Sequence, residues 1–260
     1  MAFPGDRPTV IGHRGLGGGT VDGHRENSLG SFMAAAAAGV DWLEVDVRRT
    51  ADDVLVVAHD PAYDDGTFHV DTTAATAKER GTLLLADLVA SVPPEVGLDF
   101  DLKSSMEDAA RPAAETTAAL LAPLAAREAR RRPVAVTSFD PAALLTSRTL
   151  APGVPTGLLT WLRFPVGLAV SAAAHLDVAF LAVHMGSLRP NPIEPEEQQR
   201  PLDYIVSLLH GADRQVMAWC PTLEEQPVVL AAGVDAVCVN DVPSALARIR
   251  RQASSVAPGD

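Results

Sequence analysis

The stretch WLEVDVRRTADDVLVVAHDP, residues 42–61, predicts two strands that pair with each other. In the first, Trp42 to Val47, apolar residues alternate with Glu44 and Asp46, as side chains alternate between the faces of a strand. The second, Val54 to Ala58, follows after a turn too short for a helix, so we expect an antiparallel hairpin. Both acids share one face of a buried strand, and the simplest reason to bury them together is a bound metal ion.

Outside this hairpin, short apolar runs alternate with helix-prone segments along the chain. Such alternation is typical of a parallel sheet, and eight strand–helix units are typical of a closed barrel. The sequence therefore predicts a single (β/α)8 TIM barrel over residues 1–252, in the α/β class, with the β-hairpin as a short excursion after the second strand. Residues 253–260 are expected to form a flexible C-terminal tail. The eight predicted strands are Pro8–His13, Trp42–Val47, Gly97–Leu102, Val134–Ser138, Thr156–Thr160, Val178–Val183, Gln215–Trp219 and Ala236–Val239.

The connections are less regular than the strands. The glycine-rich segment Gly15–Gly23 and the polar segment Tyr63–Gly81 are both expected to be loops. The pair Ser105 and Asp108 has capping-box spacing, so it predicts the start of a long helix that runs to about Arg131.

Composition narrows the class of protein. With 260 residues, 47% of them hydrophobic, the chain is long enough to bury a large core. Its net charge of −12 argues against nucleic acid and against anionic membrane surfaces as partners. The N-terminus lacks the pattern of a secretory signal, and no apolar run approaches the length of a membrane span. Cys220 and Cys238 do not make a disulfide framework, so we expect a cytoplasmic protein.

In a (β/α)8 barrel the functional site lies at the C-terminal ends of the strands. Carboxylates without thiolates favour a hard cation such as Mg²⁺ or Ca²⁺, and two histidines beside it suit acid–base catalysis. Arginine and lysine supply the positive charge expected around a phosphoryl group. These residue types together predict metal-assisted cleavage of a phosphodiester. The residues expected at the mouth are His13, Arg14, Glu44, Asp46, His59, Asp101, Lys103 and Trp219.

The motifs HRG, ENS, LEVDVRRTADD and VVAHDP, in this order over residues 13–61, resemble the glycerophosphodiester phosphodiesterase family. Weaker similarity continues through LDFDLK (residues 98–103), VTSFDP (residues 136–141) and GVDAVCVND (residues 233–241). The resemblance implies hydrolysis of a small-molecule glycerophosphodiester to an alcohol and sn-glycerol 3-phosphate. It also implies that a glycerol hydroxyl attacks phosphorus and that water then opens the cyclic phosphate.

The resemblance assigns a role to each matching residue. It implies that His13 and His59 are the acid–base pair. The cation would be held by Glu44, Asp46 and Asp101, with Glu26 as a further ligand or a near neighbour. The phosphate would be bound by Arg14 and Lys103, and Trp219 would pack beside the glycerol or the leaving group.

Some residues depart from the family pattern or fall outside it. Asp101 stands where the family usually has glutamate, and the loop before Glu26 is longer and carries His24 and Arg25. Asp99 and His184 also lie near strand ends, and both are interpreted as structural residues. The head group, the ion, the oligomeric state and the role of the glycine-rich loop stay open. Two alternative functions are a phospholipase D-like lyase that forms a cyclic phosphate from lysophospholipids and a non-catalytic barrel that binds phosphorylated ligands.

Overall fold

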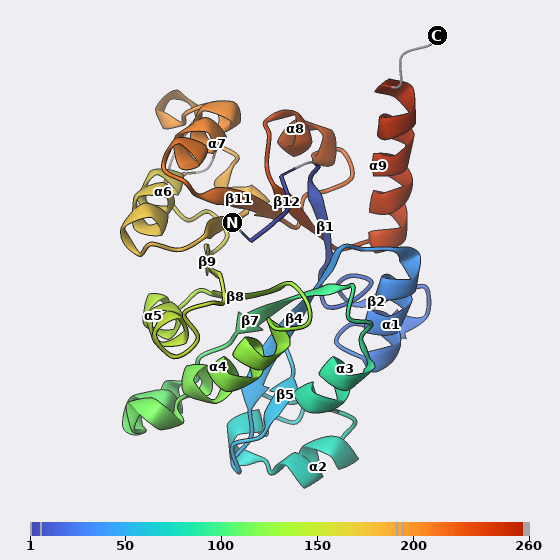
Figure 1. Ribbon diagram of the computed structural model, residues 1–260, viewed down its shortest axis with the longest axis vertical. Coiled ribbons are helices and arrows are strands. Elements are labelled where there is room, and N and C mark those ends of the chain that lie inside the picture. Colours follow the sequence, from blue (N-terminus) through green and yellow to red (C-terminus); the bar gives the residue numbers. More distant parts are fainter. Residues whose placement is uncertain (1, 6, 191, 194, 257–260) are drawn as a thin grey trace.

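The computed structural model describes residues 2–5, 7–190, 192–193 and 195–256. Within them, eight parallel strands form a closed barrel, because β1 (Thr9–Gly12) pairs with β4 (Trp42–Arg49) on one side and with β12 (Ala236–Val239) on the other. The predicted (β/α)8 barrel is therefore confirmed (Figure 1). The barrel strands, in order along the chain, are β1 (Thr9–Gly12), β4 (Trp42–Arg49), β7 (Gly97–Leu102), β8 (Val134–Ser138), β9 (Thr156–Leu159), β10 (Phe180–His184), β11 (Gln215–Trp219) and β12 (Ala236–Val239).

The predicted excursion after the second barrel strand is also confirmed. Strand β5 (Leu55–Val57) runs antiparallel to β4, and β6 (Leu83–Leu84) runs antiparallel to β5. The hairpin carries the chain across the C-terminal end of β4, so the residues just after β5 lie at the mouth of the barrel.

Helices surround the barrel in an outer layer (Figure 1). Ser28 caps the first helix by accepting a hydrogen bond from the backbone of Ser31, and Gly39 ends that helix in the left-handed conformation. The helices are α1 (Leu29–Ala38), α2 (Ala74–Glu79), α3 (Leu85–Ser91), α4 (Thr117–Glu128), α5 (Pro141–Leu150), α6 (Val166–His175), α7 (Leu202–Gly211), α8 (Gln226–Ala231) and α9 (Val242–Val256). Among the described residues, no helix combines the length and the apolar composition that a bilayer span requires.

The alternation along β4 separates two environments. Leu43, Val45 and Val47 belong to the large apolar core between barrel and helices. Glu44 and Asp46 point into the barrel, where they are almost fully buried. At the opposite end of the barrel from the mouth, Phe3 fills the interior between the rings of Trp42 and Phe180, which are the first residue of β4 and of β10.

Three expectations about the connections were wrong. The loop Gly15–Gly23 runs into a small hairpin of β2 (Thr20–Val21) and β3 (His24–Arg25), and the expected loop Tyr63–Gly81 contains α2. The long helix from Ser105 is instead two 3-10 turns, Met106–Ala110 and Ala113–Glu115, followed by α4.

The 3-10 turns form because a tertiary contact holds the segment before α4. Asp108 does make the predicted capping box with Ser105, but its carboxylate also binds buried Arg49 at 3.1 Å and accepts from the backbone of Thr117 at 3.3 Å. A continuous helix would carry Asp108 away from Thr117. At the other terminus, α9 continues to Val256, four residues past the predicted boundary at 252, and residues 257–260 lie outside the described part of the chain.

Candidate active site

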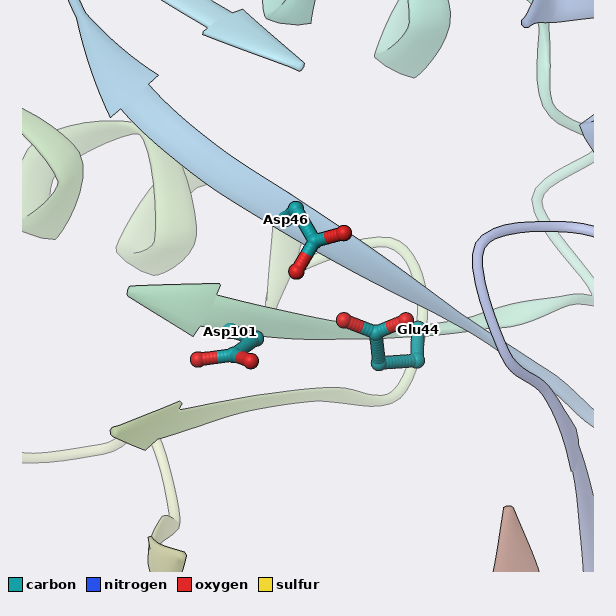
Figure 2. Close-up of side chains that lie close together, drawn as sticks. All are labelled: Glu44, Asp46 and Asp101. Carbon is teal, nitrogen blue, oxygen red and sulfur yellow. The ribbon is translucent and has the colours of Figure 1, made fainter. Parts of the chain in front are cut away.

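Three buried carboxylates form the centre of the barrel mouth. Glu44 and Asp46 come from β4, and Asp101 comes from the neighbouring strand β7, where it is in register with Asp46. One oxygen of each carboxylate lies within 4.8 Å of one oxygen of the other two. Figure 2 shows the three side chains close together on the two neighbouring strands. The predicted convergence of these acids is therefore what the fold produces.

Two cations lie among these acids and reduce their mutual repulsion. Lys103 places its Nζ 2.9 Å from Asp46 Oδ1 and also contacts Asp101. Arg14 places its Nε 3.3 Å from Asp46 Oδ2, and its backbone N–H donates to Glu44 Oε2 at 2.9 Å. Arg14 is therefore held by both acids of β4.

The pKa values of the acids divide according to these contacts. Burial, helped by the charges of Asp46 and Asp101, raises the pKa of Glu44 well above its usual range. Burial also raises the pKa of Asp101, although Lys103 opposes the shift. Burial acts in the same direction on Asp46, but Lys103 and Arg14 outweigh it and lower the pKa of Asp46. The cluster therefore contains three carboxylates but only two neighbouring cationic side chains, and two of the three carboxylates have raised pKa values.

The donor set fits a hard divalent cation. Glu44 Oε1 and Asp101 Oδ1 are buried carboxylate oxygens without a hydrogen-bond partner, a costly arrangement unless something else binds them. Oxygen ligands of this kind are preferred by Mg²⁺ and Ca²⁺. The buried acidic cluster is thus able to hold such an ion.

His13 follows β1 and lies directly against the acidic cluster. Its Nε2 is 3.9 Å from Glu44 Oε2, and its Nδ1 is 2.5 Å from the side-chain oxygen of Asn240. His59 follows β5, and its Nδ1 is 2.8 Å from Asp60 Oδ1. Both histidines line one small cavity of about 40 Å³ at the mouth, so the fold brings the predicted pair to the same place.

The rest of that cavity is lined from the other side of the barrel. Trp219, at the end of β11, packs edge-on against Phe139 with ring centroids 6.0 Å apart. Lys103 lies 5.6 Å from the centre of the Phe139 ring. The mouth thus has a charged half, built on β1, β4 and β7, and an aromatic half, built on the loop after β8 and on β11.

A wider groove of about 470 Å³ opens on the outer side of His59. Arg25 and Asp60 are among the residues that line it, so the loop before Glu26 reaches the same region as the hairpin. His59 lies at the boundary of the cavity and the groove. A ligand larger than the cavity has room to extend past this histidine.

Glu26 does not join the cluster. Its carboxylate binds Arg14 at 2.8 Å and accepts a hydrogen bond from the backbone of Gly19. The carboxylate of Glu26 therefore lies beside the cluster and is joined to it through Arg14.

Three supporting residues were missed by the sequence analysis. Asn27 donates to Asp46 Oδ2 at 2.8 Å, and Arg48 donates to the backbone carbonyl of His59 at 2.9 and 2.6 Å. Asn240 holds His13 as described above. Asn240 directly follows a predicted strand, so the rule that placed other strand-end residues at the mouth would have found it. Arg48 also directly follows a predicted strand, Trp42–Val47, so the same rule would have placed it at the mouth.

His184, interpreted as structural, lies at the mouth as well. Its Nδ1 accepts from the backbone of Gly186 at 2.8 Å, and its ring packs edge-on against Trp219 with centroids 4.2 Å apart. It supports the aromatic half of the mouth.

Comparison with known proteins gives one family. The glycerophosphoryl diester phosphodiesterase family model matches residues 13–244. A probable glycerophosphodiester phosphodiesterase from Mycobacterium tuberculosis is 27% identical over 218 residues, which cover 78% of this chain and 76% of that protein. A Schizosaccharomyces pombe glycerophosphocholine phosphodiesterase is 38% identical over 109 residues, 40% of this chain but only 9% of that protein. The chain thus matches only a small part of the fungal relative.

Solved structures with the same fold include two that cover nearly the whole chain. A protein from Galdieria sulphuraria, described as a putative glycerophosphodiester phosphodiesterase, aligns with a TM-score of 0.75 at 22% identity, over 93% of this chain and 97% of that one. A phosphodiesterase from Oleispira antarctica, solved in complex with the product sn-glycerol-3-phosphate, aligns with a TM-score of 0.72 at 22% identity. That alignment covers 94% of this chain and 97% of the other. At these identities the likeness shows the barrel fold.

Proposed function

Because this chain belongs to the glycerophosphoryl diester phosphodiesterase family, we propose that it is a phosphoric diester hydrolase that converts glycerophosphodiesters to an alcohol and sn-glycerol 3-phosphate. The observation that carries the proposal is the mouth itself. Three clustered carboxylates, two histidines and two cations converge at one end of the barrel. This combination suits a phosphodiester, which needs its negative charge neutralised and two protons transferred.

The metal would be held by Glu44, Asp46 and Asp101. When bound, a divalent cation supplies positive charge that stabilises the negative charge developing on the phosphoryl oxygens. The unpartnered oxygens of Glu44 and Asp101 support this assignment. Arg14 and Lys103 add fixed positive charge beside the same acids, where the phosphate would bind.

The two histidines would move the protons. One imidazole accepts the proton of a glycerol hydroxyl as that oxygen bonds to phosphorus, and the other donates a proton to the departing alcohol oxygen. Water then opens the cyclic phosphate to give glycerol phosphate, with the histidines in exchanged roles. Trp219 would pack against the glycerol or the alcohol. The net charge of −12 argues against nucleic acid as a partner and supports a small molecule as the substrate.

The first test is hydrolysis of glycerophosphocholine and glycerophosphoethanolamine by metal-stripped protein, with Mg²⁺ or Ca²⁺ added back. Release of glycerol phosphate only with metal is the expected result. A product that stops at the cyclic phosphate would instead indicate the lyase. Tight binding of glycerol phosphate without turnover in either ion would indicate a binding protein.

A second test concerns the histidines. We expect His13→Ala and His59→Ala each to lower kcat by about 10²–10⁴-fold, the usual contribution of a general acid or base. The melting temperature should change little. His175→Ala, on the exposed side of α6, is the matched control and should retain full activity. Full activity in both active-site variants would refute the proposed acid–base pair.

A further inference from the structure

We propose that Asn240 is a positioning residue that holds His13 in the tautomer protonated on Nδ1, which makes Nε2 the atom that exchanges protons with substrate. The inference builds on the proposed function and adds to it the atom at which His13 acts. It also gives a role to the glycine-rich loop after β1.

Asn240 and His13 come from neighbouring parallel strands at the same height. Gly12, the last residue of β1, is in register with Val239, the last residue of β12. The backbone N–H of His13 then donates to the carbonyl of Val239 at 3.2 Å. The residues that follow these two strands, His13 and Asn240, therefore lie side by side at the mouth. This pairing brings the Asn240 amide oxygen to 2.5 Å from His13 Nδ1.

The two nitrogens of His13 have different surroundings. A neutral imidazole has one N–H donor and one acceptor nitrogen, and an amide oxygen can only accept. The Nδ1 edge faces Asn240, with the Cys220 sulfur also near, 3.8 Å from Nδ1. The Nε2 edge faces the acidic cluster, 3.9 Å from Glu44. With the proton on Nδ1, the lone pair of Nε2 points toward the reacting groups.

The glycine-rich loop packs against the backbone of Asn240. A Cβ on Gly17 would lie 1.7 Å from the Asn240 carbonyl oxygen, and Gly17 has φ +147°. The backbone of Val242 donates to the carbonyl of Leu16 at 2.9 Å, which joins the loop to the start of α9. Only glycine permits this approach of two backbones. The loop therefore fixes the position of Asn240, and through it the ring of His13.

The first experiment compares two substitutions of Asn240 for turnover of glycerophosphocholine. Asn240→Leu has a similar volume but no acceptor, whereas Asn240→Asp keeps an oxygen at the same place. We expect Asn240→Leu to lower kcat by about 10–100-fold, as loss of a group that orients a functional histidine does. KM should change little, and Asn240→Asp should recover most of the loss. Equal kcat in wild type and Asn240→Leu would overturn the proposal.

The second experiment reads the tautomer directly by ¹⁵N NMR of labelled histidine, with His13 identified by comparison with His13→Gln. In neutral wild-type protein, Nδ1 should show the shift of a protonated nitrogen and Nε2 that of an acceptor. Asn240→Leu should move the populations toward the Nε2-protonated form. Protonation of Nε2 in the wild type would overturn the proposal. This measurement needs no turnover, so it separates a failure of this inference from a failure of the proposed function.

The loop is tested with two glycine variants that share a positive φ. Gly17→Ala would meet the Asn240 carbonyl, whereas Gly23→Ala, at φ +79°, meets nothing within 4 Å. Both should lose some stability through backbone strain. Only Gly17→Ala should also lower kcat and alter the His13 tautomer. A matching loss of kcat in Gly23→Ala would show that the loop does not act through Asn240.

Discussion

At the scale of single residues, Asp99 has an unusual environment. It is fully buried on β7, in register with Glu44 and one inward-facing position before Asp101. Thr137 donates to one of its oxygens at 3.0 Å, and the other oxygen has no partner. Burial, followed by the charge of Asp101, raises the pKa of Asp99 to about 7. The sequence analysis interpreted Asp99 as a structural residue and did not predict its raised pKa.

The raised pKa predicts a specific dependence of stability on pH. Between the unfolded pKa near 4 and about 7, the folded state binds more protons than the unfolded state, so stability falls as pH rises. We expect metal-free wild type to lose about 2 kcal/mol relative to Asp99→Asn between about pH 5 and pH 8. Urea unfolding at several pH values measures this difference. Asp213→Asn, at an exposed site, is the control and should run parallel to wild type.

At the scale of elements, glycines in two barrel strands make room for large rings. A Cβ on Gly157 of β9 would lie 2.3 Å from the Phe180 ring, and one on Gly97 of β7 would lie 2.4 Å from the Trp42 ring. The barrel interior is narrow and closely packed, so a large side chain on one strand requires a small one on its neighbour. These two glycines therefore allow the large rings to pack at the end of the barrel opposite the mouth.

This packing predicts a strong effect from one methyl group. Gly157→Ala should destabilise the protein by about 1–3 kcal/mol, because the Phe180 ring must leave its rotamer or the strands must separate. Gly153→Ala, whose Cβ meets nothing within 4 Å, should cost little. Thermal unfolding of the two variants decides the matter: equal stability would mean that the Phe180 ring moves aside freely.

At the scale of the whole molecule, the N-terminal segment closes the end of the barrel opposite the mouth. Phe3 is 2% exposed, and its backbone is held on both sides by Gln215, which accepts from the Phe3 N–H at 2.9 Å and donates to the Phe3 carbonyl at 2.9 Å. Its ring packs edge-on against Phe180 with centroids 4.8 Å apart. The segment thus completes the interior core.

Removal of the Phe3 ring should lower the stability of the fold without changing the catalytic rate. Phe3→Ala is expected to destabilise the protein by about 3–5 kcal/mol, the usual cost of removing a buried phenyl ring. The kcat of the folded fraction should stay at the wild-type value, because the ring lies at the far end of the barrel. Leu150→Ala, at an exposed apolar position on α5, is the control for thermal unfolding. A loss of kcat in Phe3→Ala at temperatures where it remains folded would contradict the expectation that the Phe3 ring contributes to stability and not to catalysis.

Much of the barrel was predictable because its signals are local. The alternation of apolar and acidic residues in LEVDV is a property of neighbouring residues, and it gave both the strand and the face on which Glu44 and Asp46 lie. Asp101 and Lys103 followed from the same pattern in β7. The segment from Ser105 to Thr116 was mispredicted, since its conformation depends on the contact of Asp108 with Arg49, which is distant along the chain.

The sequence alone determined the strand–helix alternation, the residues at the strand ends and hence the family, since each depends on residue order and on the two-residue period of a strand. Only the tertiary structure decided which oxygens of the acids are left without partners, that the carboxylate of Glu26 binds Arg14, and that Asn240 and Gly17 support His13. These relations join residues as far apart as β1 and β12. They exist only when the barrel closes, because closure is what makes the first and last strands neighbours.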